Sequence, residues 1–177
     1  MIDVRTAHTS ALDPGTLAEL RHFLDEAFAG TFDDDDWDHA LGGIHVLGTE
    51  DGALVAHASV VQRRLLHGGR ALRAGYVEAV AVRADRRRRG YGRATMQVIG
   101  ETIAGAYEVG ALAAGEDGAR LYRTLGWRRW EGRTWVLGPE GPRRTPEDDD
   151  AVYVLPGTAR LDVTGDLACD WRGGAVW

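Results

Sequence analysis

The sequence predicts an α/β domain built on a twisted, mixed and mostly antiparallel sheet of about six to seven strands, flanked by helices. Two observations indicate this class. Four strand-like runs occur within residues 2–83, with one helical segment after the first run, as in an antiparallel meander. Residues 75–114 then pass through a strand, a loop, a helix and a second strand, a crossover whose two strands run parallel.

Periodicity and turn residues define the elements of the first half. Asp13 suits a helix cap, and Leu17, Leu20 and Leu24 recur after it at helical spacing. The turn Glu50-Asp51-Gly52 separates two β-rich runs. The expected elements are a strand over 2–8, a helix from 13 to about 29, a short helix over 36–41, and strands over 43–49, 53–66 and 71–83.

Glycines and prolines divide the second half into shorter elements. A helix-prone run begins at Gly90, and Gly126 ends a second, short helix. Prolines and glycines between Gly138 and Pro146 predict a loop. We expect residues 1–177 to form a single domain. The expected elements are a helix over 90–106, a strand over 107–114, a turn over 115–118, a short helix over 119–125, strands over 127–130, 134–137 and 152–155, and a tail over 168–177.

The central feature of the sequence is a basic loop with two glycines, Arg87-Arg88-Arg89-Gly90-Tyr91-Gly92, between a strand and a helix. Glycines let a backbone approach a ligand closely, a helix N-terminus presents free N–H groups, and arginines suit phosphate. The dinucleotide fingerprint fails because Thr95 stands where the third glycine is needed. The nucleotide-binding phosphate loop fails because no Gly-Lys-Ser/Thr follows. The loop therefore predicts a site for a different phosphorylated ligand.

The charge distribution indicates two ligands of opposite sign. The net charge is −6, yet the arginines cluster in one loop and acids form two runs, Asp33 to Asp36 and Glu147 to Asp150. A phosphorylated cofactor at the arginines and a small cationic substrate at the acids fit this pattern. The alternative for each acid run is a solvated surface loop. The basic footprint is too local for general nucleic-acid binding.

Several other classes of site are not expected. The six histidines lack metal-ligand spacing, so no metal is predicted. The lone cysteine, Cys169, excludes an internal disulfide framework and is expected to be a small buried residue. No apolar run reaches the roughly 20 residues of a membrane helix, and the N-terminus lacks signal-peptide character. The expected location is therefore the cytoplasm, with no membrane partner.

The loop and its surroundings resemble a known superfamily. The basic loop, followed by Ala119-Arg120-Leu121-Tyr122 and Gly126-Trp127, resembles the acetyl-CoA-dependent GNAT N-acetyltransferases. A closer resemblance, to the aminoglycoside 2'-N-acetyltransferases, covers nearly the whole chain. It is carried by Glu26-Ala27-Phe28-Ala29-Gly30, Asp36-Trp37, His39-Ala40-Leu41-Gly42-Gly43, Gln62-Arg63-Arg64-Leu65, Gly75-Tyr76-Val77-Glu78, Ala81-Val82-Arg83-Ala84-Asp85, Arg144-Thr145-Pro146, Val154-Leu155-Pro156 and Cys169-Asp170-Trp171-Arg172.

The resemblance implies direct acetyl transfer from acetyl-CoA to a primary amine, with acetyl-CoA in the splay between two central parallel strands. Glu78 matches the family's general base, acting through water, and Tyr122 matches the general acid. Backbone groups of Val80, Ala81 and Val82 match those that hold the thioester and pantetheine. The pyrophosphate would be bound by Arg87, Arg88, Arg89, Gly90, Tyr91 and Gly92.

The resemblance also identifies a substrate pocket. Asp36, Asp148 and the terminal carboxylate of Trp177 match groups that receive ammonium groups, while Glu78 and Ala79 line the pocket. The sequence departs from the family pattern at three further positions: Thr31 and Ala175 replace acids, and Ala113 replaces a serine. A pocket with fewer acids favours a substrate with fewer amines, or with a different set of them.

Several hypotheses stay open for the substrate. A small cationic aminosugar is expected, and aminoglycosides with a 2'-amine rank ahead of kasugamycin, which carries its own acidic group. Polyamines, protein N-termini and binding of the antibiotic without turnover are the rival hypotheses. Relatives indicate a homodimer.

The two proposed catalytic residues also have purely structural interpretations. Glu78 could be an inward charge at a strand irregularity, paired with an arginine such as Arg63. As a base, its burial among valines would raise its pKa toward the working range. Tyr122 could be a core aromatic; as an acid, it is expected in the N-terminal turn of its helix, where the dipole favours proton donation.

Overall fold

The computed structural model describes residues 2–177, except for the side chains of residues 116 and 117. The chain separates into two compact units. The first unit contains residues 2–61 and 77–99, and the second contains residues 62–76 and 100–177. Three elements continue from one unit into the other: strands β3 (Ala53–His67) and β4 (Arg70–Val82), and helix α3 (Tyr91–Ala106). The predicted α/β class with a mixed sheet is confirmed.

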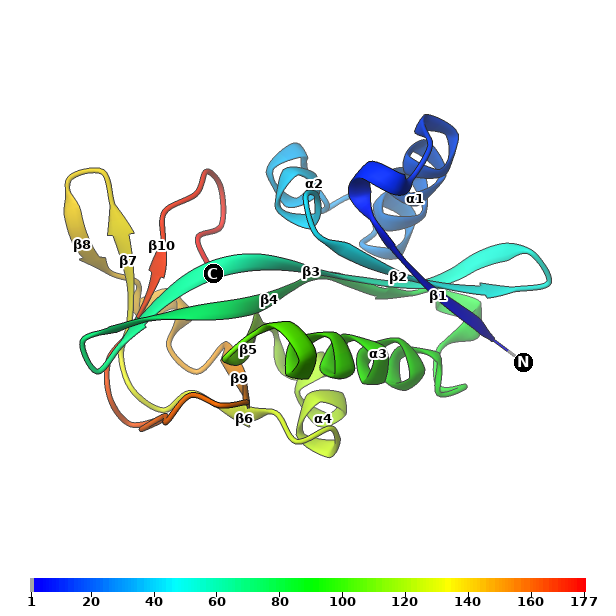
Figure 1. Ribbon diagram of the computed structural model, residues 1–177. Helices are drawn as coiled ribbons and strands as arrows, with labels where there is room; N and C mark the ends of the chain where they lie inside the picture. Colours follow the sequence, from blue (N-terminus) through cyan, green and yellow to red (C-terminus); the bar gives the residue numbers. More distant parts are fainter. Residues whose placement is uncertain (1) are drawn as a thin grey trace. The chain divides into compact units, whose positions relative to one another are not determined.

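The first unit is an antiparallel arrangement covered by helices. Strands β1, β2 and the first part of β3 are neighbours in that order, with Thr6 opposite Val46 and Val46 opposite Ala58. Figure 1 shows α1 and α2 on one face of these strands and the start of α3 on the other. The elements other than β3, β4 and α3 are β1 (Asp3–His8), a 3-10 turn (Thr9–Ala11), α1 (Pro14–Ala27), α2 (Asp34–Ala40), β2 (Ile44–Glu50) and a 3-10 turn (Ala84–Arg86).

Side-chain caps decide where the two N-terminal helices begin. Asp13 Oδ1 accepts the Thr16 N–H at 3.0 Å, as its sequence position predicts. Helix α2 begins two residues earlier than expected, because Asp33 and Asp36 cap each other's backbone N–H groups. The acid run thus begins a helix, where negative charge is favourable.

The second unit combines parallel and antiparallel pairing. Strand β5 runs parallel to β4, from Ala74 opposite Val109 to Tyr76 opposite Ala111, and antiparallel to β9. The predicted parallel crossover is confirmed, and its pairing lies near the start of the strand expected over 71–83. The remaining elements are β5 (Val109–Ala113), α4 (Glu116–Thr124), β6 (Arg128–Arg129), β7 (Thr134–Gly138), β8 (Gly141–Arg144), a 3-10 turn (Pro146–Asp148), β9 (Val152–Pro156) and β10 (Leu167–Asp170).

Three expectations for this unit were wrong. Residues 138–146 are not a plain loop, because β7 and β8 form a tight hairpin in which Gly141 adopts a φ of 112°. The tail contains β10, which pairs parallel with β7 and antiparallel with β3. The short helix begins at Glu116 rather than Ala119. With the two additional strands β8 and β10, residues 2–177 contain ten strands, more than the sheet of about six to seven that was expected.

No helix within residues 2–177 has both the length and the apolar character to cross a membrane.

We predict that Gly43→Ala destabilises the protein. An added Cβ at Gly43 would lie 2.1 Å from the Val60 carbonyl oxygen, which belongs to strand backbone and cannot rotate away. The free energy of unfolding should fall by about 2 kcal/mol, measured by chemical denaturation. Gly105→Ala is the matched control, because nothing lies within 4 Å of its added Cβ. Equal stability of the two variants would contradict the prediction.

Candidate functional site

Strand β4 is irregular at the proposed base. Ala79 adopts a φ of 50°, in the left-handed region, which costs an L-residue about 1 kcal/mol. Glu78, directly before it, is half-buried. Two β3 side chains reach this backbone: His57 Nδ1 lies 2.8 Å from Ala79 O, and Ser59 Oγ lies 3.5 Å from Glu78 O. The structural interpretation of Glu78 placed it at such an irregularity, and one is present in β4.

The backbone after this irregularity carries the predicted thioester-binding residues. Ala81 packs in the apolar cluster beneath α1, which also contains Leu20 and Leu24. Val80 and Val82 are half-buried. These residues are thus anchored by core packing, and their N–H and C=O groups are the parts that could contact a ligand.

The basic loop leads into helix α3 through two left-handed residues, Arg88 at φ 64° and Gly90 at φ 85°. The first intrahelical bond is donated by Ala94 N–H to Gly90 O, at 2.9 Å. The N–H groups of the first turn before Ala94 therefore have no partner within the helix. Open space surrounds Gly90, where nothing lies within 4 Å of an added Cβ. This loop can receive an anion.

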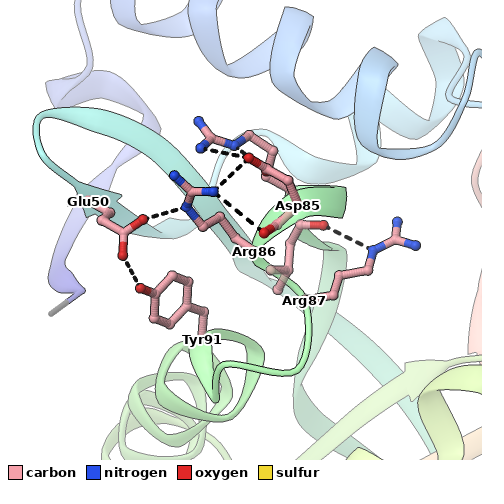
Figure 2. A network of polar contacts seen from close by, with 7 residues as sticks. Glu50, Asp85, Arg86, Arg87 and Tyr91 are labelled. Atoms are coloured by element: carbon pink, nitrogen blue, oxygen red, sulfur yellow. Dashed lines mark hydrogen bonds and ion pairs between the residues drawn. The ribbon is translucent and has the colours of Figure 1, made fainter.

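An ion-pair network attaches this loop to the β2–β3 hairpin (Figure 2). Arg86 Nε donates to Glu50 Oε2 at 2.5 Å, and Arg86 Nη1 donates to Asp85 at 2.7 Å. The Tyr91 hydroxyl donates to the other Glu50 oxygen. These contacts, that of Tyr91 first and that of Arg86 second, lower the pKa of Glu50. Tyr91 is buried, so only its backbone N–H is available to a ligand.

The other loop arginines are disposed differently. Arg87 donates to two backbone carbonyls, Val82 O at 3.3 Å and Ala27 O at 3.4 Å. Arg88 and Arg89 are exposed. The network thus uses Arg86 to hold the loop, while Arg88 and Arg89 present their charge to solvent.

Two predicted substrate residues of the first unit have structural partners. Thr31 is exposed, and its hydroxyl donates to Phe28 O at 2.8 Å. One carboxylate oxygen of Asp36 accepts the Asp33 N–H at 3.2 Å in the α2 cap. An ammonium group at Asp36 would therefore share a carboxylate that already caps a helix.

Tyr122 is not in the first turn of its helix, as the sequence had predicted. It lies near the end of α4, where its carbonyl accepts N–H groups of Leu125 and Trp127. Its ring is 6 % exposed and packs against Trp127 and Tyr153, with centroids 6.2 Å away. Burial raises the pKa of Tyr122 to about 12. The phenol is therefore protonated throughout the physiological range, and the dipole argument for its acidity was wrong.

The acids of the second acid run, Glu147 to Asp150, differ in whether an arginine lies next to them. Arg144 donates to Asp149 at 2.7 Å, and this bond holds the pKa of Asp149 well below its usual range. Glu147 and Asp150 each lie within 4 Å of an arginine. Asp148 has no ion pair among residues 2–177, and its pKa is raised, first by burial and then by the neighbouring acids. Asp148 is thus the acid of this run left to meet a cation.

The C-terminal residue is fixed rather than frayed. The Trp177 indole N–H donates to Thr145 Oγ1 at 3.0 Å, and its side chain is 5 % exposed. Arg63 Nη1 donates to Val176 O at 2.7 Å. Because the Asp148 N–H donates to Thr145 O at 2.9 Å, Thr145 brings Asp148 and Trp177 together within the second unit.

Arg63, considered above as a partner for Glu78, forms an ion pair with Asp170 at 2.7 Å. Its guanidinium also donates to Asp170 O and lies 4.7 Å from the Tyr76 ring centroid. Arg63 therefore joins β3 to β10 and the C-terminal tail.

A charged hollow of about 520 Å³ lies where β5 leads into α4. Ala113, the predicted substrate residue, is exposed at the end of β5, and the hollow begins at Ala114. Its charged lining residues are Arg120, Arg123, Arg129, Asp149 and Asp150.

Sequence reasoning missed the partners that organise these sites. Glu50, the buried His45–His57 pair and Thr145 lie far along the chain from the residues they hold. Glu50 is 36 positions from Arg86, Thr145 is 32 from Trp177 and His57 is 22 from Ala79, and no local pattern marks hydrogen bonds over such separations. Among the described side chains, which do not include those of residues 1, 116 and 117, no group of three or more histidine, cysteine or acidic side chains is arranged to hold a metal ion.

We predict that Asp149→Asn lowers stability in a pH-dependent way. Because the pKa of Asp149 is depressed in the folded state, its ionised form stabilises the fold above about pH 4. The loss should be about 1–2 kcal/mol at neutral pH and should shrink as the pH falls below about 4, measured by denaturation. Glu147→Gln is the control, since its pair with Arg143 is exposed and 3.9 Å long. A loss independent of pH would refute the assignment.

Comparisons with known proteins agree with this architecture. The family described as Acetyltransferase (GNAT) domain matches residues 8–130. An aminoglycoside 2'-N-acetyltransferase of Mycolicibacterium fortuitum is 50 % identical over 177 residues, covering 98 % of this chain and 91 % of the relative. A GNAT N-acetyltransferase of Escherichia coli, solved with CoA, matches with a TM-score of 0.67 at 18 % identity, covering 94 % of this chain and 88 % of that one.

A GNAT acetyltransferase of Brucella melitensis, solved with acetyl-CoA, matches with a TM-score of 0.63 at 15 % identity, covering 98 % of this chain and 97 % of that one. At these identities the solved structures establish the fold alone. The extent of the family match and the identity to the Mycolicibacterium fortuitum relative establish the family as well. The chain belongs to the GNAT acetyltransferases, in the same family as the aminoglycoside 2'-N-acetyltransferase of Mycolicibacterium fortuitum.

Proposed function

We propose that this acetyltransferase, acting as one domain, transfers the acetyl group of acetyl-CoA to the 2'-amine of aminoglycoside antibiotics and so confers resistance to them. The observation that carries this proposal is the 50 % identity to an aminoglycoside 2'-N-acetyltransferase over 98 % of the chain. That alignment covers nearly the whole chain and therefore extends beyond the GNAT match at residues 8–130.

The basic loop fits the pyrophosphate of acetyl-CoA. The exposed guanidinium groups of Arg88 and Arg89 can neutralise phosphate oxygens, and the first-turn N–H groups of α3 can donate to them. Gly90 leaves the space that a close backbone approach requires. Acetyl-CoA would supply the acetyl group as an activated thioester. The pair Glu50 and Arg86 would act indirectly, by fixing the loop before the ligand arrives.

Glu78 is assigned the role of general base. An alkyl ammonium cannot attack a thioester until it loses a proton, and a carboxylate can accept that proton directly or through one water. The half-buried position of Glu78 shields it from bulk solvent, which supports this role. Backbone N–H groups of Val80 to Val82 are assigned to the thioester and pantetheine.

Tyr122 is assigned to the thiolate that leaves. A thiol has a pKa near 8.5, so complete proton transfer from a phenol of pKa about 12 would be uphill by about 5 kcal/mol. A hydrogen bond donated by the protonated phenol carries no such cost. We therefore assign Tyr122 the stabilisation of the thiolate by hydrogen bonding, with the final proton coming from solvent.

The substrate's ammonium groups are assigned to Asp148, Asp36 and the carboxylate of Trp177. Asp148 has the best support, because its neighbours in the run are neutralised by arginines. The pKa of Asp148 is raised first by burial and second by the neighbouring acids, and a bound cation would offset both effects. The fixed position of Trp177 supports a role for its terminal carboxylate.

Kasugamycin is the second candidate substrate, and one observation favours it. In the hollow that begins beside Ala113, Asp150 pairs with Arg129 and Asp149 pairs with Arg144. The other two lining arginines, Arg120 and Arg123, suit an anionic group on the substrate. Two acids expected from the family are replaced by Thr31 and Ala175, so fewer ammonium groups would be needed.

We predict CoA release with acetyl-CoA and tobramycin, which carries a 2'-amine, detected by a thiol reagent. Kanamycin A, with a 2'-hydroxyl, should react far more slowly, because an alcohol is the weaker nucleophile. Expression in a sensitive bacterium should raise the inhibitory concentration of tobramycin. Turnover of kasugamycin alone would move the assignment to the second candidate. Turnover of spermidine or peptide N-termini alone would refute both.

We predict that Glu78→Gln and Tyr122→Phe both lower kcat, to different extents. Loss of the base should reduce kcat by about 100-fold or more at neutral pH, with a smaller loss at high pH, where the free amine is abundant. Loss of one hydrogen bond to the thiolate should reduce kcat by about tenfold. The KM for acetyl-CoA should change little in either variant, as steady-state kinetics will measure. A Glu78→Gln enzyme with normal kcat across the pH range would eliminate this base.

A further inference from the structure

Two fully buried histidines of the first unit, His45 on β2 and His57 on β3, have no role in the proposed chemistry. His45 Nδ1 and His57 Nε2 lie 3.0 Å apart. This pair is the middle of a chain of hydrogen bonds. At one end His45 Nε2 lies 2.8 Å from Thr9 Oγ1, and at the other His57 Nδ1 lies 2.8 Å from Ala79 O. A polar connection therefore crosses the core from Thr9 to the left-handed alanine of β4.

The direction of each hydrogen bond in this chain follows from its last acceptor, the Ala79 carbonyl oxygen. A carbonyl oxygen only accepts, so His57 Nδ1 carries a proton. Burial lowers the pKa of His57 to about 3 and that of His45 to about 4, so both rings are neutral at physiological pH. His57 Nε2 must then accept a bond from His45 Nδ1–H, which leaves His45 Nε2 to accept from Thr9. The single Thr9 hydroxyl proton is assigned to this 2.8 Å contact, in preference to the Gly43 carbonyl oxygen at 3.3 Å. The Gly42 N–H donates to Thr9 Oγ1 at 2.9 Å and completes the chain.

This connection fixes the backbone at the proposed base. The Ala79 carbonyl belongs to the peptide group that follows this left-handed residue. The carbonyl of Glu78 belongs to the peptide group that precedes it, so both peptide groups depend on the conformation of Ala79. Ala79 is held at two points. Its methyl side chain packs beside the apolar cluster under α1, and its carbonyl is hydrogen-bonded by His57. Loss of the His57 donor would leave a poorly solvated carbonyl unpaired, which favours relaxation of the strained conformation.

We propose that His57, supported by His45 and Thr9, is a positioning residue for Glu78: its Nδ1–H holds the Ala79 carbonyl and thereby the left-handed turn that orients the carboxylate. The catalytic consequence rests on the proposed function, whereas the structural consequence rests on the hydrogen-bond chain alone.

Nitrogen-15 NMR of histidine-labelled protein tests the chain without any substrate. Both rings should be Nδ1–H tautomers with unprotonated Nε2, a form that is the minor one for histidine in water. Their signals should not titrate between about pH 8 and pH 6, although an ordinary histidine does. An Nε2–H tautomer at either ring would overturn the proposed chain.

Kinetics of three variants test the positioning role. His57→Leu removes the donor at similar volume and should lower kcat at least about tenfold, with the KM for acetyl-CoA within about twofold. His57→Asn, whose amide can donate from near the Nδ1 position, should recover most of the lost kcat. Val46→Ala is the matched control, a buried residue on β2 whose side chain points to the opposite face from that of His45. It should lower thermal stability and leave kcat unchanged.

The outcomes separate this inference from the proposed function. If His57→Leu keeps normal kcat, or Val46→Ala loses as much, the inference is overturned and the function stands. If the wild type acetylates no aminoglycoside, the function fails and amide hydrogen exchange decides the inference: exchange at Ala79 and Val80 should accelerate in His57→Leu and stay unchanged in Val46→Ala. If His57→Leu does not fold, Thr9→Val, which alters the half-buried end of the chain, should give the same changes at smaller size.

Discussion

The site depends on one alanine held in the left-handed region within a β-strand. An L-residue adopts this conformation at a cost of about 1 kcal/mol, so its surroundings must hold it there. Ala79 is held by packing beside the α1 cluster and by a histidine bonded to its carbonyl. The residue before it is the proposed base, Glu78. A regular strand would alternate its side chains strictly, and the irregularity frees this segment from that alternation.

Charge in this protein is divided between residues that build the sites and residues that stay available to ligands. In the basic loop, Arg86 and Tyr91 are held by Glu50, while Arg88 and Arg89 are exposed. The second acid run follows the same rule, because arginines neutralise most of its members and Asp148 keeps its charge unpaired among residues 2–177. Fixing the structural charges first limits the reorganisation that binding requires.

Burial changes the chemical role that Tyr122, the proposed acid, can have. The sequence placed Tyr122 at a helix N-terminus, where its phenol would be more acidic, whereas the structure places it near the helix C-terminus in an aromatic cluster. Desolvation raises its pKa to about 12. A phenol with such a high pKa contributes by donating a hydrogen bond, because complete transfer of its proton to the thiolate is unfavourable. The same residue therefore keeps its proposed place in the reaction with a different physical role.

Local sequence patterns were sufficient to predict the α/β class, the order of the main elements and the basic loop before α3. These features are local, because they follow from residue periodicity, turn residues and a charge pattern within some twenty positions. Strands β8 and β10, the start of α4 and the partners of Arg86, Thr145 and His57 became known from the tertiary structure. Those depend on edge pairing and on contacts between residues far apart in the chain, such as Glu50 with Arg86 and Thr145 with Trp177, which no local pattern encodes.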